Sequence, residues 1–158
     1  MKKKKLLVAL LAGVFGFSAC NDAAEELFKQ ESEIKLTSEI TQARVTSQNL
    51  QSTQIVNGQQ VGVFIDGARD PHNNVKWTAD SNGNLDTSTP AYWDSGNVTI
   101  TAYHPYYAAY NGNSYTFSVN TDQSTDDNYV NSDLLWTNKT TTKSPNPVAL
   151  TFVHKLSK

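Results

Sequence analysis

The stretch Val148-Ala149-Leu150-Thr151-Phe152-Val153-His154-Lys155-Leu156 carries the alternation that decides the fold class of this chain. Every second side chain from Val148 to Leu156 shares one face, and the intervening side chains share the other. Such alternation is typical of a β-strand, in which successive side chains point to opposite faces of a sheet. The alternation runs to Leu156, two residues before the last residue, Lys158. We therefore expect an incomplete C-terminal strand edge that a later strand or another chain must cover.

Further segments upstream show the same period of two and predict more strands. Their alternating positions are Ile34, Leu36 and Ile40; Val61, Val63 and Ile65; Val75 and Trp77; Val98, Ile100 and Ala102; and Tyr115, Phe117 and Val119. The segment around Val63 is apolar on both faces, which predicts a central strand. Residues 134–136 form one more compact apolar patch.

Short turn motifs separate these segments. They are Asn57-Gly58, Asp66-Gly67, Asn82-Gly83, Ser95-Gly96 and Asn111-Gly112. Asn-Gly and Asp-Gly pairs supply the residues with positive φ that tight hairpins require. Short strands with this punctuation predict an all-β fold, specifically an antiparallel β-sandwich.

The composition suits a single secreted β domain. Of 158 residues, 38% are hydrophobic and 46 are Asn, Ser or Thr. The net charge is −2, and without the four lysines at residues 2–5 the chain has 9 basic against 15 acidic residues. An acidic chain with no basic cluster lacks the electrostatic footprint of a nucleic-acid-binding protein, so we expect no nucleic-acid partner.

The N-terminus has the order of a secretory signal peptide: basic residues 2–5, apolar residues 6–17, then small residues before Cys20. The apolar run is too short to span a bilayer as a helix. Phe17-Ser18-Ala19-Cys20 resembles a bacterial lipobox, which implies that Cys20 is lipidated and becomes the first mature residue. An ordinary signal peptide with a chance cysteine is the alternative. We predict a lipoprotein signal at 1–19, a polar tether at 20–32 and a β domain at 33–158.

No catalytic constellation is present in the sequence. His72, His104 and His154 lie far apart without zinc-type spacing, and no nucleophile elbow, phosphate loop or dinucleotide motif occurs. The run from Asp80 to Asp86 offers alternate oxygen ligands, but it lacks the glycine and glutamate positions of a calcium loop. We interpret it as a hairpin turn and expect a protein that is not an enzyme and has no metal or cofactor.

Aromatic residues crowd into one part of the chain and suggest an alternative function. Trp93, Tyr103, Tyr106 and Tyr107 lie close in sequence, together with Tyr92 and Tyr110. Exposed together, such rings could stack on sugars, as in a glycan-binding surface lipoprotein. Packing within a strand explains Tyr103 equally well.

Several segments, in order, resemble the fimbrillin family of Bacteroidales. They are Gln60-Val61-Gly62-Val63-Phe64-Ile65, Tyr92-Trp93, Ala102-Tyr103-His104-Pro105-Tyr106, Asp122-Gln123-Ser124, Ser132-Asp133-Leu134-Leu135 and Leu150-Thr151-Phe152-Val153-His154-Lys155-Leu156. The resemblance implies a lipid-anchored outer-membrane protein that builds or anchors surface fimbriae (type V pili) and supports cell adhesion. It also implies two transthyretin-like β-sandwich domains in tandem, of which residues 33–158 cover the first and the second is absent.

The resemblance further implies how subunits join. In the family a trypsin-like protease cuts after an arginine near the first strand, and Arg44 occupies the matching position. Loss of the N-terminal segment then opens a groove that accepts a strand from the next pilus subunit. The alternative for Arg44 is an ordinary loop arginine.

Overall fold

The computed structural model describes residues 32–41, 53–114 and 116–156. The predicted signal peptide, nearly all of the predicted tether, Cys20 and Arg44 lie outside the described residues. The structural statements below concern the described ranges.

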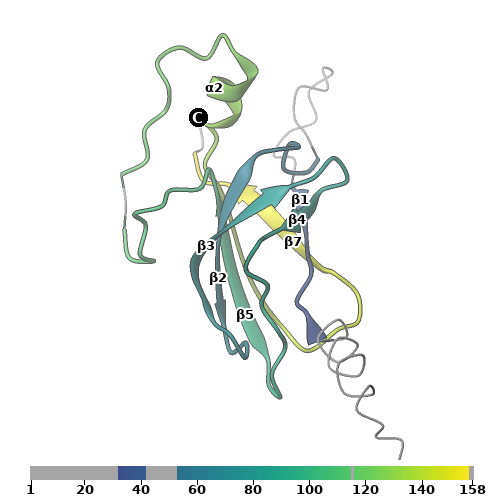
Figure 1. Cartoon of the computed structure of the whole chain (residues 1–158). Helices are drawn as coiled ribbons and strands as arrows, with labels where there is room; N and C mark the ends of the chain where they lie inside the picture. The colour runs from purple at the N-terminus through teal and green to yellow at the C-terminus, as the bar shows by residue number, and fades with distance from the viewer. Residues whose placement is uncertain (1–31, 42–52, 115, 157–158) are drawn as a thin grey trace, which may run out of the picture.

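The described part of the chain contains seven strands and one short helix, joined by turns and loops (Figure 1). The elements are β1 (Leu36–Ile40), β2 (Gln60–Asp66), β3 (His72–Ala79), β4 (Asn84–Asp86), β5 (Val98–His104), α2 (Asp126–Val130), β6 (Leu135–Thr141) and β7 (Val148–His154). The all-β prediction is confirmed, since the one described helix has only five residues.

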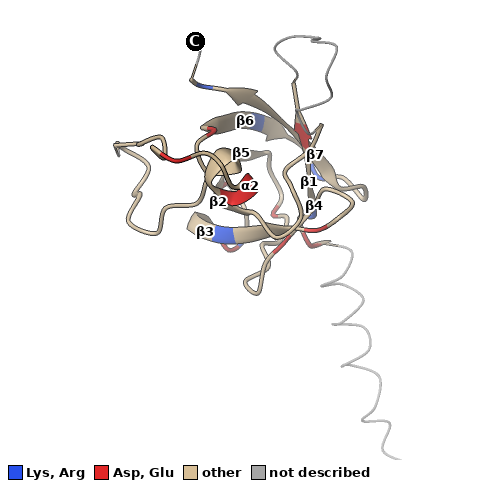
Figure 2. Cartoon of the chain, turned by 90° about the horizontal axis from the view of Figure 1, so that it is seen from above, with Lys and Arg blue, Asp and Glu red and all other residues tan. Residues whose placement is uncertain are grey.

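The strands close into a barrel in the order β1-β4-β3-β2-β5-β6-β7. Figure 2 shows them from above, surrounding the interior, with acidic residues on α2 at one end. All neighbours are antiparallel except β1 and β7, which run parallel from Leu36 opposite Val148 to Ile40 opposite Phe152.

The predicted antiparallel, transthyretin-like β-sandwich is therefore wrong. The physical reason is the position of β1, which lies between β4 and β7 and joins what would be the free edges of two sheets. The predicted incomplete edge at the C-terminal strand is wrong for the same reason. β7 pairs with β1 on one side and, at Trp136 and Leu135, with β6 on the other.

The alternating positions predicted for five of the strands fill the barrel. β2 pairs with both β3 and β5, as each strand of the closed barrel pairs with two neighbours. The inward residues of the longer strands are buried: Leu36, Val61, Val63, Ile65, Trp77, Ala79, Val98, Ile100, Ala102, Val148, Leu150 and Phe152. Burial of the Val, Leu, Ile and Phe side chains among them contributes about 1.5–3 kcal/mol each and is the main source of stability.

A second apolar layer lies on the outside of β2, β5 and β6. We name it the outer aromatic cluster and define it as Phe64, Tyr103, Tyr110 and Trp136. Tyr110 meets Tyr103 edge-on at 5.0 Å between ring centroids and Phe64 at 5.6 Å. Edge-to-face contacts are a preferred aromatic geometry. The cluster holds the segment after β5 against the barrel wall.

Two sequence predictions of local structure have different outcomes. Four of the five predicted turn glycines adopt positive φ, namely Gly58, Gly67, Gly83 and Gly112. The strand predicted around Phe117 is wrong: residues 116–120 belong to no strand, and Val119 is 46% exposed. The alternation there has no sheet edge to join, because β5 already pairs with β2 and β6.

Candidate functional site

β1 lies between β4 and β7 in the barrel and is paired with both. We call the space that it occupies between β4 and β7 the β1 slot. On the β4 side, the Ser38 amide donates to the Gly83 carbonyl at 2.8 Å, and the Ile40 amide donates to the Thr53 carbonyl at 2.8 Å. Leu36 lies opposite Leu85 in the same ladder.

The other edge of β1 is bonded to β7. The Val148 amide donates to the Lys35 carbonyl at 2.8 Å, and the Thr41 amide donates to the Phe152 carbonyl at 2.9 Å. A strand paired along both edges closes the sheet, so removing it would leave backbone donors and acceptors of β4 and β7 unpaired.

The inner face of β1 carries one polar residue among apolar ones. Leu36 and Ser38 are buried, and Ile40 packs against the core. The Ser38 hydroxyl donates to the Gly83 carbonyl at 3.1 Å and accepts from the Ile55 amide at 3.2 Å. Ser38 was not predicted as a site residue, although a serine at an inward position of an apolar alternation was the available signal.

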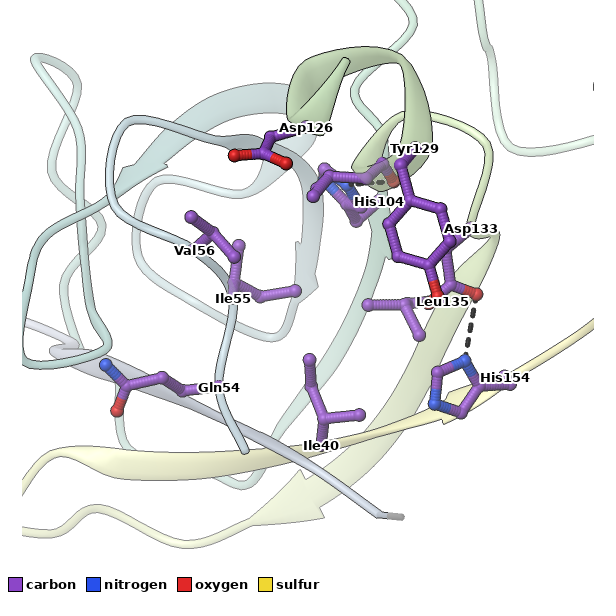
Figure 3. Close-up of a pocket in the computed structure, with 11 residues that line it drawn as sticks. Ile40, Gln54, Ile55, Val56, His104, Asp126, Tyr129, Asp133, Leu135 and His154 are labelled. Atoms are coloured by element: carbon purple, nitrogen blue, oxygen red, sulfur yellow. Dashed lines mark hydrogen bonds and ion pairs between the residues drawn. The ribbon is translucent and has the colours of Figure 1, made fainter. Parts of the chain in front are cut away.

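A cavity of about 290 Å³ lies at the end of the barrel where β1 stops. Figure 3 shows Ile40, Ile55 and Leu135 facing one another across it, with α2 above. His154, at the end of β7, places Nδ1 2.8 Å from Asp133 Oδ1. The cavity therefore combines an apolar wall with a histidine-carboxylate pair.

His104 borders the same cavity and is buried between two carbonyl groups. Its Nδ1 lies 2.9 Å from the Gln60 oxygen, and its Nε2 lies 3.3 Å from the Val130 oxygen. Burial lowers the pKa of His104, although these two carbonyl groups act in the opposite direction. The arrangement ties β2, β5 and α2 together, and each ring nitrogen of His104 faces a backbone carbonyl group. Within the described ranges, no three His, Cys, Asp or Glu residues are grouped to hold a metal ion.

The acidic run after β3 is a turn held by its own side chains. Asp80 Oδ1 accepts from the Asn82 and Asn84 amides, both at 2.8 Å, and Asp80 Oδ2 accepts from Asn84 Nδ2 at 2.8 Å. The hydrogen bond from the Asn84 side chain is the largest cause that lowers the pKa of Asp80. The turn presents the Gly83 carbonyl to the β1 slot.

The four aromatic residues of the glycan-binding alternative are not brought together on the surface. Trp93 is 2% exposed and packs in the barrel core, whereas Tyr103 is buried in the outer aromatic cluster. Tyr106 is half-buried, and Tyr107 is 50% exposed. The rings of Trp93 and Tyr103 are therefore not accessible to a ligand.

Among the residues with described structure, no helix is long and apolar enough to cross a membrane. No curated protein matches the chain.

Solved structures with a similar fold come from Bacteroides. A putative cell adhesion protein of Bacteroides ovatus has 22% identity and a TM-score of 0.56, over 79% of this chain and 53% of that one. A fimbrial protein of the same species has 20% identity and a TM-score of 0.53, over 77% and 28%. A putative cell adhesion protein of Bacteroides uniformis has 22% identity and a TM-score of 0.55, over 80% and 49%.

These identities establish a shared fold alone. The chain spans about half the length of the two adhesion proteins and about a quarter of the fimbrial protein. Residues 41–158, most of the chain, match the fimbrillin-like family. The chain therefore belongs to the fimbrillin-like family.

Proposed function

We propose that this chain is a structural or anchoring subunit of surface fimbriae and supports cell adhesion. Its membership of the fimbrillin-like family supports this role. Structures of the same fold include one described as a fimbrial protein and two described as putative cell adhesion proteins. The protein acts through contacts with other subunits rather than through catalysis.

In this role the mature protein lies on the outer membrane, held by lipid on Cys20. One acyl chain binds a membrane only reversibly, and two give stable anchoring. Replacing Cys20 by Ala should abolish incorporation of labelled palmitate and release the protein from the membrane fraction. Persistent labelling of the Cys20→Ala variant would contradict this anchor.

Subunits join after a trypsin-like protease cuts at Arg44. The observation that carries this step is the placement of β1, which is bonded along both edges and ends just before the segment that contains Arg44. The Ile40 amide binds the Thr53 carbonyl, so both ends of that segment meet at one end of the barrel. A cut between them leaves β1 held by noncovalent contacts alone.

Release of β1 would open the β1 slot to a strand from the next subunit. The incoming strand would satisfy the backbone groups of β4 and β7 while its alternate side chains fill the apolar interior. Burial of about 25 cal/mol per Å² of apolar surface favours this exchange once the covalent link is cut.

The test replaces each of the two arginines of the chain in the full-length protein. Arg44→Ala should leave an unprocessed subunit in immunoblots and no fibres in electron micrographs. Arg69→Ala is the matched control and should be processed and assembled normally. Normal fibres from the Arg44→Ala variant would refute the proposed maturation.

A further inference from the structure

We propose that the strand which fills the β1 slot in an assembled fibre carries a small hydroxyl residue between two large apolar residues, at alternate positions. This inference rests on the proposed function, because it assigns the chemistry of the partner strand at the same site. Leu36, Ser38 and Ile40 now hold the three inward positions of the slot. The side chains that fit these three positions define the partner strand.

The middle position requires a hydroxyl group. Ser38 is 4% exposed, and its oxygen both donates to the Gly83 carbonyl and accepts from the Ile55 amide. Ile55 is itself buried, so its amide loses its acceptor when the hydroxyl is removed. A buried donor without a partner is costly, which disfavours an alanine at this position.

The middle position also limits size. The Ser38 backbone amide and side chain both contact the Gly83 carbonyl, so a larger side chain would have to displace that carbonyl. The turn cannot move away easily, because the Asp80 carboxylate binds the Asn82 and Asn84 amides on either side of Gly83. Asp80 is therefore a positioning residue for the slot.

The two flanking positions require large apolar side chains. Leu36 is buried in the core, and Ile40 packs against the core and lines the barrel-end cavity together with Ile55 and Leu135 (Figure 3). The pattern of apolar, hydroxyl and apolar residues at alternate positions reads the same in both directions. The requirement therefore holds whether the partner strand runs parallel or antiparallel to β7.

A peptide-exchange experiment tests the inference. A sequence-specific protease site is inserted within residues 42–52 of the whole chain, and the folded protein is cut there. Fluorescent peptides that copy residues 34–41 are then added, and their capture is followed by anisotropy. The variants are Ser38→Ala, Ser38→Leu and, as a control at an exposed position, Glu39→Ala.

The native peptide and the Glu39→Ala peptide should exchange equally well. The Ser38→Ala peptide should bind roughly tenfold more weakly, because one buried amide is left unpaired. The Ser38→Leu peptide should show no capture. In the uncut chain, Ser38→Ala should lower the Tm, which tests the same hydroxyl without any exchange.

The possible outcomes distinguish a failure of this inference from a failure of the proposed function. Equal capture of the serine, alanine and leucine peptides would overturn the inference and leave strand replacement standing. Failure of every peptide, the native one included, would overturn both. An uncut Ser38→Ala chain with an unchanged Tm would overturn the inference alone.

Discussion

The ring of Tyr103 on β5 lies over Gly62 on β2, its cross-strand neighbour. A Cβ atom on Gly62 would overlap the tyrosine ring, so the glycine is what allows the ring to lie flat on the sheet. The Tyr103 hydroxyl reaches past β2 and donates to Asn74 Oδ1 on β3 at 2.7 Å. One ring thus links three adjacent strands.

Gly62→Ala should destabilise the protein by about 1–3 kcal/mol, because the added methyl group forces the Tyr103 ring or the sheet to move. The measurement is the free energy of unfolding in urea. Gly96→Ala is the matched control, since a Cβ there meets open space, and it should change stability by less than about 0.5 kcal/mol. Equal effects of the two substitutions would contradict the packing of Tyr103 on Gly62.

Tyr103→Phe should cost about 0.5–1.5 kcal/mol, because it removes the hydroxyl that binds Asn74 and accepts from the Tyr107 amide at 3.1 Å. Hydrogen exchange should accelerate at the Tyr107 amide. Tyr129→Phe is the control, because that ring is half exposed on α2. Unchanged exchange at Tyr107 in the Tyr103→Phe variant would disprove the contact.

Stability should fall as the pH drops below about 6.5. Burial lowers the pKa values of His72 and His104 from their ordinary value of 6.5. The unfolded chain then binds protons more tightly than the folded chain at acidic pH, so stability is fully present above 6.5 and declines below it. Thermal melts between pH 7.5 and 5 measure the effect.

A His72→Gln, His104→Gln double variant should show a smaller decline of Tm over the same pH range. Comparison with the parent chain isolates the two histidines from the carboxylates, which remain in both proteins. An identical pH profile would mean that neither buried imidazole contributes.

Asp80→Ala should lower the Tm, because the turn loses the three hydrogen bonds that the carboxylate accepts. Calcium should not change the Tm of the parent chain, since these oxygen atoms already bind the turn itself. Asp86→Ala, at the end of β4, serves as the control. A Tm that rises on addition of calcium would contradict the interpretation of this run as a turn without a metal ion.

The strands that sequence predicts well are those with large apolar residues at alternate positions and a turn motif nearby. β2 and β5 meet both conditions, and β7 meets the first. β6 is harder, because Asn138, Lys139 and Thr140 are polar and exposed beyond the apolar patch at its start. Periodicity also predicts a strand without identifying the strand with which it pairs. This explains why the strand predicted at residues 116–120 is wrong.

The barrel could not be foreseen for the same reason. It depends on Leu36 lying beside Val148, a pairing between the two ends of the domain that no local pattern encodes. The contacts of the candidate site could not be predicted for the same reason. The role of Ser38 appears only when Gly83 and Ile55, distant in sequence, are brought to it.

The parallel contact of β1 with β7 also sets the timing of folding. Because β1 pairs with β7, which lies more than a hundred residues later in the chain, the barrel cannot close until both strands have been synthesised. Topologies dominated by such distant contacts fold slowly. Until β7 is available, β1 has no partner along that edge, so docking of β7 completes the backbone pairing of the first described strand.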